Sequence, residues 1–143
     1  MSNQKPVIGV IGGHEASKED LDLAYEVGKH SATRGAVLVC GGLDGIMEAA
    51  SKGAFENNGT VLGILPGSSK GDANPYVTIA IPTMLGISRN VQVVNASDVI
   101  IAFPGSYGTL SEIALALATD KTVICFPGTW DIKRIGIVDL SRF

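Results

Sequence analysis

The chain has 143 residues, of which 45% are hydrophobic and 17% charged, and its formal net charge is −3. The length suits one domain with a hydrophobic core, and the charge balance, which has no basic cluster, argues against sequence-independent binding of nucleic acid. The apolar runs are too short to cross a membrane and the start does not resemble a signal peptide, so a cytoplasmic protein without a membrane partner is expected. The low share of charged residues favours a homodimer or a larger homo-oligomer.

Short apolar runs alternate with amphipathic segments along the chain, which is typical of alternating strands and helices. Strands are predicted at residues 7–11, 36–40, 60–65, 77–81, 99–103 and 122–126. Helices are predicted at residues 17–34, 46–57, 87–96 and 110–119. This order predicts an α/β fold: a Rossmann-like, doubly wound, mainly parallel sheet with helices on both faces. It occupies a single domain over residues 1–143, and no element is assigned to the tail at residues 128–143.

Two cysteines and the histidines bear on metal chemistry. Cys40 and Cys125 each end a predicted strand, and both are expected to be buried free thiols. No group of Cys and His has the spacing of metal ligands, so no metal site is predicted.

Glycine-rich turns follow the first, second and fifth predicted strands. Their residues are Gly12 and Gly13, then Gly41, Gly42 and Gly45, and finally Pro104, Gly105, Ser106, Tyr107, Gly108 and Thr109. Parallel strands end at one edge of a sheet, and ligands bind there at the point where the strand order reverses. Backbone N–H groups at the start of a helix favour an anion. The three turns together therefore predict a composite site for a small phosphorylated ligand.

The third turn carries a second prediction, which concerns the start of the following helix. Gly108 is expected to allow a bend that a side chain would obstruct. Thr109 is placed to cap a helix that begins near Leu110, with Glu112 at its third position, as in a capping box. The carboxyl of Glu112 then either only caps the helix, or acts as a general base or an acceptor for a ribose hydroxyl beside Arg89.

A cation is the other requirement of an anion site. One helix N-terminus contributes about 0.3–1 kcal/mol toward an anion, or roughly 2 kcal/mol when partly buried, which is too little alone. Arg89 is either a solvated helix residue or a guanidinium that pairs with phosphate or carboxylate. Tyr107 either covers a planar ring of the ligand or packs on a neighbouring subunit. Ser106 and Ser111 have no histidine partner, so a serine nucleophile is not predicted.

Residues 104–112, Pro-Gly-Ser-Tyr-Gly-Thr-Leu-Ser-Glu, resemble the PGGxGTxxE motif of the Lonely Guy (LOG) family. Residues 41–47, Gly-Gly-Leu-Asp-Gly-Ile-Met, resemble the GGxxGxM turn of that family, and Arg89 falls at the position of its catalytic arginine. The resemblance extends to about Phe126. LOG proteins are cytokinin-activating phosphoribohydrolases that are often mislabelled lysine decarboxylases. Decarboxylation is not expected here, because no lysine lies in a plausible cofactor pocket.

Residues 86–90 and 108–113 resemble more closely the LOG-like branch that includes molybdenum-cofactor carrier proteins. Three positions depart from the hydrolases. Ser106 replaces the second glycine of the motif, Asn90 replaces the lysine after the arginine, and Ser111 replaces the first of two glutamates.

The resemblance implies a ribonucleotide monophosphate or a phosphorylated pterin as the ligand, with Gly108, Thr109 and nearby backbone around the phosphate. In a carrier, molybdenum cofactor (molybdopterin) would be the cargo and no further cofactor would be required. In a nucleoside 5′-monophosphate phosphoribohydrolase, Arg89 and Glu112 would be the catalytic residues. They would stabilise the oxocarbenium-like ribosyl centre while water cleaves the N-glycosidic bond. A structural or regulatory subunit with a vestigial pocket is the third hypothesis, and the sequence leaves all three open.

Overall fold

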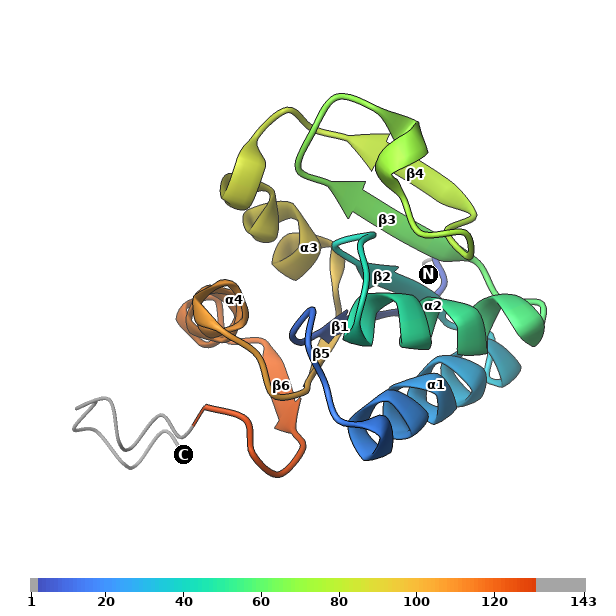
Figure 1. The fold of residues 1–143 in the computed structure, drawn as a ribbon, viewed down its shortest axis with the longest axis horizontal. Coiled ribbons are helices and arrows are strands. Elements are labelled where there is room, and N and C mark those ends of the chain that lie inside the picture. The colour runs from blue at the N-terminus through green and yellow to red at the C-terminus, as the bar shows by residue number, and fades with distance from the viewer. Residues whose placement is uncertain (1–2, 131–143) are drawn as a thin grey trace.

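The computed structural model describes residues 3–130 (Figure 1). The strands are β1 (Val7–Ile11), β2 (Val37–Cys40), β3 (Val61–Leu65), β4 (Ile79–Pro82), β5 (Val99–Ala102) and β6 (Thr122–Cys125). The α-helices are α1 (Lys18–Thr33), α2 (Ile46–Glu56), α3 (Asn90–Ala96) and α4 (Tyr107–Ala118). Two short 3₁₀ turns, η1 (Lys70–Asp72) and η2 (Gly86–Arg89), flank β4.

The strands form one parallel sheet in the order β4-β3-β2-β1-β5-β6. The chain moves outward from β1 to β4, then returns to place β5 on the other side of β1. Ile8 of β1 accordingly pairs with Leu38 of β2 on one side and with Val99 of β5 on the other. This reversal between β1 and β5 is the switch point at which ligands bind in such sheets. The predicted doubly wound fold is confirmed.

Helices cover both faces of the sheet, as the continuous apolar strands require. Val10 packs with α1 and α2 in one core, while the next residue, Ile11, packs with α3 and α4 in the other. Successive side chains of a strand point to opposite faces, so one apolar strand serves both cores. Figure 1 shows α1 and α2 on one side of the sheet and α3 and α4 on the other.

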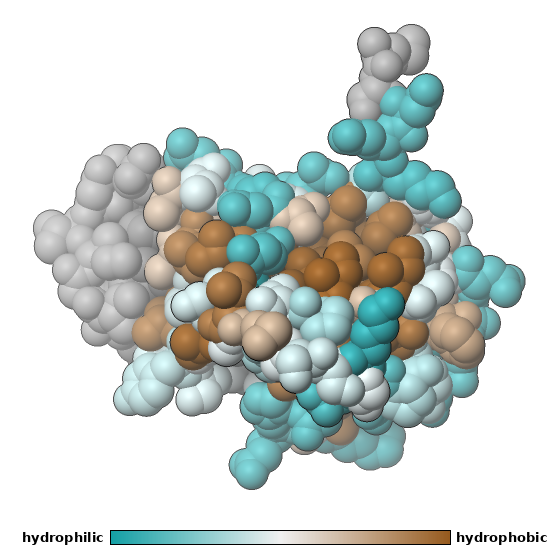
Figure 2. All heavy atoms as spheres, turned by 90° about the horizontal axis from the view of Figure 1, so that it is seen from above, coloured by the Kyte–Doolittle hydropathy of each residue, from teal (hydrophilic) through white to brown (hydrophobic). Residues whose placement is uncertain are grey.

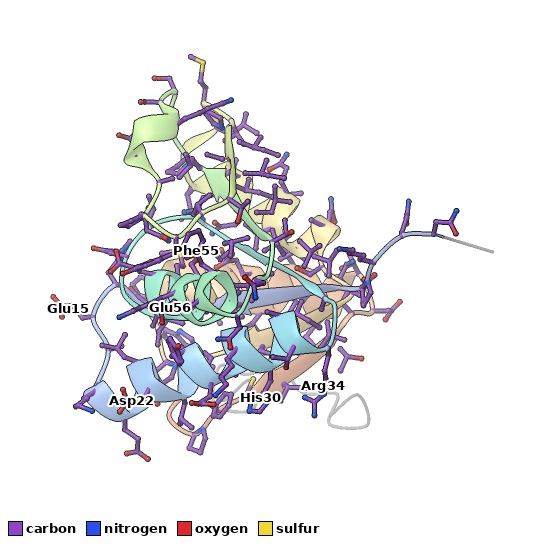
Figure 3. All side chains as sticks on the ribbon, turned by 90° about the vertical axis from the view of Figure 1, so that its right-hand side faces the viewer. Glu15, Asp22, His30, Arg34, Phe55 and Glu56 are labelled. Carbon is purple, nitrogen blue, oxygen red and sulfur yellow. The ribbon has the colours of Figure 1, made fainter. Side chains whose placement is uncertain are left out.

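Helices α1 and α2 lie side by side in unusually close contact (Figure 3). A Cβ atom added to Gly28 of α1 would lie 1.9 Å from the carbonyl oxygen of Ala50 in α2. A Cβ added to Gly53 of α2 would lie 2.0 Å from the carbonyl oxygen of Tyr25 in α1. Each glycine thus admits the backbone of the other helix. The hydroxyl of Tyr25 also donates to the carboxylate of Glu56 at 2.8 Å.

The predicted start of the fourth helix is wrong. Helix α4 begins at Tyr107, and the N–H of Leu110 already donates to the carbonyl oxygen of Ser106 at 3.1 Å. Thr109 and Glu112 therefore lie inside the helix and form no capping box. Gly108 has ordinary helical geometry without a positive φ, and a Cβ there would meet nothing closer than 3.9 Å. Position 108 therefore does not need a glycine to allow a bend.

Smaller differences concern β4, the thiols and the tail. Strand β4 begins at Ile79, two residues later than predicted. Both cysteines are free, but only Cys40 is buried; Cys125 is exposed because β6 is the edge strand of the sheet. The tail is described as far as Trp130, whose indole N–H donates to the carbonyl oxygen of Ser106 at 3.0 Å. The rest of the tail lies outside the described residues.

Candidate functional site

The three glycine turns meet at the switch point and are joined by hydrogen bonds. The N–H of Gly13, after β1, donates to the carbonyl oxygen of Pro104, after β5, at 2.9 Å. The carbonyl oxygen of the same Gly13 accepts from the N–H of Ile46, the first residue of α2, at 3.1 Å. The turn after β1 therefore connects the turn after β2 to the turn after β5.

Close backbone approach explains the glycine at two of these positions. Gly45 has a φ of +64°, and a Cβ there would lie 2.3 Å from the carbonyl oxygen of Gly13. A Cβ at Gly41 would lie 2.7 Å from a terminal nitrogen of the Arg89 guanidinium. A side chain at Gly45 would separate the turns, and one at Gly41 would displace the arginine.

A cavity of about 390 Å³ opens at this edge of the sheet. It is lined by parts of all three turns, the start of α4 and the end of η2. The lining residues are Val10, Ile11, Gly12, Gly13, His14, Gly41, Met47, Pro66, Ile87, Arg89, Asn90, Ser106, Gly108, Thr109 and Glu112. This volume lies within the range of small-molecule sites.

Arg89 is the cation of the cavity. Only 9% of its surface is exposed, so it is not a solvated helix residue. One terminal nitrogen donates to the side-chain carbonyl oxygen of Asn90, and the guanidinium packs against the backbone of Gly41. Among residues 3–130, its buried Nε atom has no hydrogen-bond partner. Burial lowers the pKa of Arg89, but a guanidinium stays charged in proteins, so a positive charge lies in the wall of the cavity.

Glu112 is the acid of the cavity. Its side chain projects from the second turn of α4 and is 7% exposed. Burial raises the pKa of Glu112 to about 8, although the nearby charge of Arg89 acts in the opposite direction. Arg89 and Glu112 do not form an ion pair within 4.0 Å. The ion pairs at that distance within residues 3–130 are all exposed: His14–Asp44, Lys18–Asp22 and His30–Glu26. Burial therefore favours the neutral carboxylic acid form of Glu112, which can donate a hydrogen bond.

A polar network joins the arginine to helix α4. The side-chain amide of Asn90 donates to Ser111 Oγ at 3.1 Å and to the carbonyl oxygen of Gly108 at 3.4 Å. Ser111 Oγ donates to the same carbonyl oxygen at 2.6 Å. Two of the three departures from the hydrolase motif, Asn90 and Ser111, therefore contact each other beside the cavity.

The start of α4 faces the cavity with unused backbone donors. No side chain caps this helix at Ser106, and its first N–H groups have no partner within the helix. Gly108 and Thr109, in the first turn, both line the cavity. They supply the oriented N–H groups and the positive end of the helix dipole that an anion requires.

Eight of the thirteen predicted site residues line the cavity: Gly12, Gly13, Gly41, Arg89, Ser106, Gly108, Thr109 and Glu112. The other five lie just outside it. Gly42, Gly45, Pro104 and Gly105 shape the turns, and Tyr107 is an exposed residue whose ring stacks on Trp130 at 5.9 Å between centroids.

Several residues that line the cavity were not among the site residues predicted from the sequence. Asn90 follows Arg89 directly, and Met47 lies in the first turn of the helix after a glycine turn, so both could have been found from their neighbours. His14 follows the first glycine pair, but a lone histidine is more often a surface residue; here it contacts Asp44 at the exposed rim. Pro66 and Ile87 carry no chemical signal.

Within residues 3–130, no three His, Cys, Asp or Glu side chains gather closely enough to hold a metal ion. None of the described helices combines the length and the apolar character that a membrane crossing needs.

Known proteins resemble this chain in sequence and in structure. Residues 5–139 match the model of a family described as SLOG cluster4. The molybdenum cofactor binding protein from Rippkaea orientalis is 47% identical, with a TM-score of 0.84 over 87% of this chain and 77% of that one. The molybdenum cofactor carrier protein from Chlamydomonas reinhardtii is 39% identical, with a TM-score of 0.82 over 89% and 79%.

A curated plant relative carries an enzyme name. The cytokinin riboside 5′-monophosphate phosphoribohydrolase from Arabidopsis thaliana is 34% identical over 121 residues, which are 76% of this chain and 50% of that protein. The chain thus spans about half the length of this relative.

Proposed function

The chain belongs to the SLOG cluster4 family, and we propose that its cavity binds a small phosphorylated, nucleotide-like ligand, with molybdenum cofactor as the candidate cargo. The observation that carries the proposal is the buried guanidinium of Arg89, whose Nε has no partner, at a cavity built from three glycine turns. A buried charge with an unused donor is costly unless something pairs with it. A phosphoryl group is the anion that such a set of donors accommodates best.

Magnitudes support binding by several groups together. A hydrogen bond to a charged group contributes about 1.5–3 kcal/mol, and a partly buried helix N-terminus contributes up to about 2 kcal/mol. Arg89 and the start of α4 would together supply a few kcal/mol to one phosphoryl group. The remaining cavity surface, which includes Val10, Ile11 and Met47, is apolar and suits a ring system.

The state of Glu112 favours binding over hydrolysis near neutral pH. Cleavage of an N-glycosidic bond builds positive charge on the ribosyl carbon, and an ionised carboxylate stabilises that charge. A pKa of about 8 leaves Glu112 mostly protonated at pH 7, and the protonated carboxyl offers a donor instead. Ser111, at the position of the first hydrolase glutamate, carries no charge. A carrier needs this cavity to hold its ligand without cleaving it.

The test is a thermal-shift panel of nucleoside 5′-monophosphates, phosphorylated pterins and their unphosphorylated counterparts, with wild-type protein and Arg89→Ala. We expect stabilisation of the wild type by at least one phosphorylated compound, a much smaller effect of its unphosphorylated form, and no stabilisation of Arg89→Ala. No shift with any phosphorylated compound would count decisively against the proposal.

The alternative function is nucleoside 5′-monophosphate phosphoribohydrolysis, which the presence of both Arg89 and Glu112 in one cavity favours. Release of free base from nucleoside monophosphates should then be measurable, rise as the pH passes through about 8, and disappear in Glu112→Gln. If no monophosphate yields free base between pH 6 and pH 9.5, the alternative is removed.

The same proposal includes a cytoplasmic homo-oligomer. Large hydrophobic residues lie exposed between Ile79 of β4 and Val91 of α3. Among them are Met84 (77% exposed) and Ile87 (67%), and Ile87 also lines the cavity. Figure 2 shows hydrophobic patches on the face of the molecule seen from above. Exposed apolar patches of this kind are typical of a contact between proteins. Light scattering of the purified chain should report a mass above that of one chain.

A further inference from the structure

Asn90 and Ser111 lie between Arg89 and helix α4, and neither has a role in the predicted site. The Asn90 side chain is 4% exposed and makes three hydrogen bonds: its carbonyl oxygen accepts from Arg89, and its amide nitrogen donates to Ser111 Oγ and to the carbonyl oxygen of Gly108. All its polar contacts are directed either to the guanidinium or to the first turns of α4.

We propose that Asn90 is the positioning residue of Arg89, and that Ser111 fixes the orientation of the Asn90 amide. In this arrangement, a chain of hydrogen bonds from α4 through the neutral side chains of Ser111 and Asn90 holds the guanidinium over Gly41, in the wall of the cavity. The inference rests on the proposed function, since the purpose of positioning is to present Arg89 to a phosphoryl group.

Donor and acceptor chemistry permits only one orientation of the Asn90 amide. The guanidinium only donates, and the carbonyl oxygen of Gly108 only accepts. If the amide were flipped, its NH₂ group would face the guanidinium and its oxygen would face the Gly108 carbonyl. Ser111 reinforces the choice, because its own hydrogen is used on Gly108 and its oxygen is left to accept from Asn90.

The residues of the resembled hydrolase motif could not form this hydrogen-bond arrangement. A lysine at position 90 has three donors and no acceptor, so it could not accept from Arg89. Asn90 and Ser111 are two neutral residues at positions where the resembled motif has charged ones; they bond to each other, and Asn90 bonds to the arginine.

A ligand-free measurement tests the positioning itself. In proton–nitrogen NMR spectra of the full chain, the Nε–H signal of Arg89, assigned with Arg89→Lys, should shift or broaden in Asn90→Ala and in Ser111→Ala. Asn95→Ala is the matched control, because Asn95 is an exposed asparagine on the same helix. An Arg89 signal that is the same in Asn90→Ala as in the wild type would overturn the inference, whatever the ligand.

A binding cycle tests the consequence, with inorganic phosphate as the probe at constant ionic strength. Asn90→Ala should weaken phosphate binding about tenfold and Ser111→Ala about threefold, as expected for lost hydrogen bonds to charged and neutral groups. In an Arg89→Ala background, Asn90→Ala should change the affinity less than about twofold, because the positioned group is gone. Asn95→Ala should change nothing.

The outcomes separate the two claims. Equal losses from Asn90→Ala in both backgrounds would show that Asn90 acts independently of Arg89, which refutes the positioning role while leaving the phosphate site intact. Absence of phosphate binding by the wild type, together with an Arg89 signal that responds to Asn90→Ala, would refute the phosphate site and retain the positioning. Ser111→Ala removes a single oxygen, so it provides the test if Asn90→Ala does not fold.

Discussion

The contact between α1 and α2 and the contact between α3 and α4 bury very different groups. At the first, two glycines let the helices touch through their backbones, and Gly28 approaches Ala50 with no space for a methyl group. At the second, a charged guanidinium, an amide and a carboxyl group are buried beside a cavity. One face of the sheet is packed for close contact, and the other carries polar groups at the carboxyl end of the strands.

The buried polar groups beside α3 and α4 make that side of the sheet less stable than the side covered by α1 and α2. Close apolar packing stabilises a fold directly, whereas each buried polar group costs free energy unless it is paired. Arg89 keeps an unpartnered Nε, and Glu112 is driven toward its neutral form. This cost in free energy is expected at a site where a bound ligand pairs with the buried polar groups. Substitutions between α1 and α2 should therefore destabilise the fold, whereas removal of a buried ionisable group beside the cavity should relieve a destabilising effect.

The largest loss of stability expected from one substitution is that of Gly28→Ala. The added methyl group would overlap the backbone of α2, which cannot move aside as a flexible side chain can. We expect unfolding to become easier by about 3 kcal/mol, measured by denaturant titration, with a Tm lower by roughly 10 °C. A loss below about 0.5 kcal/mol would mean that the two helices are not in this close contact.

The next effect concerns the pH dependence of stability, which Glu112 should dominate on the cavity side. Its pKa is about 8 in the folded chain and near 4.5 when unfolded, so the folded state binds the proton more tightly. Stability from this group is complete below about pH 4.5 and is lost as the pH rises through about 8, by at most about 1.4 kcal/mol per pH unit.

Glu112→Gln should therefore flatten the decline of stability between pH 5 and pH 8, as measured by denaturant titration at several pH values. The same substitution at the exposed Glu15 is the control and should leave the slope as in the wild type. If the slope in Glu112→Gln equals that of the wild type, Glu112 is ionised at neutral pH in the folded protein.

The smallest effect is expected for Gly108→Ala, which sharpens the contrast with Gly28. Both glycines lie within helices, but a Cβ at position 108 would meet only the Asn90 side chain, at 3.9 Å. Replacing an unconstrained helical glycine by alanine should stabilise the chain by about 0.5–1 kcal/mol. Destabilisation measured by the same titration would show that position 108 needs a glycine for the bend that the sequence suggested.

The fold and the place of the site could be predicted because both depend on strong local patterns. Alternating apolar strands and helices specify a parallel sheet, and glycine turns after the first, second and fifth strands meet at one edge once the strand order is known. The motifs in residues 41–47 and 104–112 indicated the LOG-like family, which the match over residues 5–139 confirms.

Details that depend on tertiary contacts could not be predicted. Thr109 looked like a helix cap, yet it is buried against Gly105, where a Cβ would lie 2.1 Å from its hydroxyl oxygen. The role of Asn90 was hidden because a 3₁₀ turn, η2, precedes α3 and decides which residues of that segment face inward. Neither the burial of Glu112 nor its raised pKa has a signature in a single sequence.

Mass spectrometry of the gently purified chain, in the wild type and in Arg89→Ala, tests the central claim most directly. We predict that a small molecule bearing a phosphoryl group copurifies with the wild type and is absent from Arg89→Ala, while both proteins remain folded. A copurifying ligand without a phosphoryl group, or the same ligand retained equally by Arg89→Ala, would contradict the account.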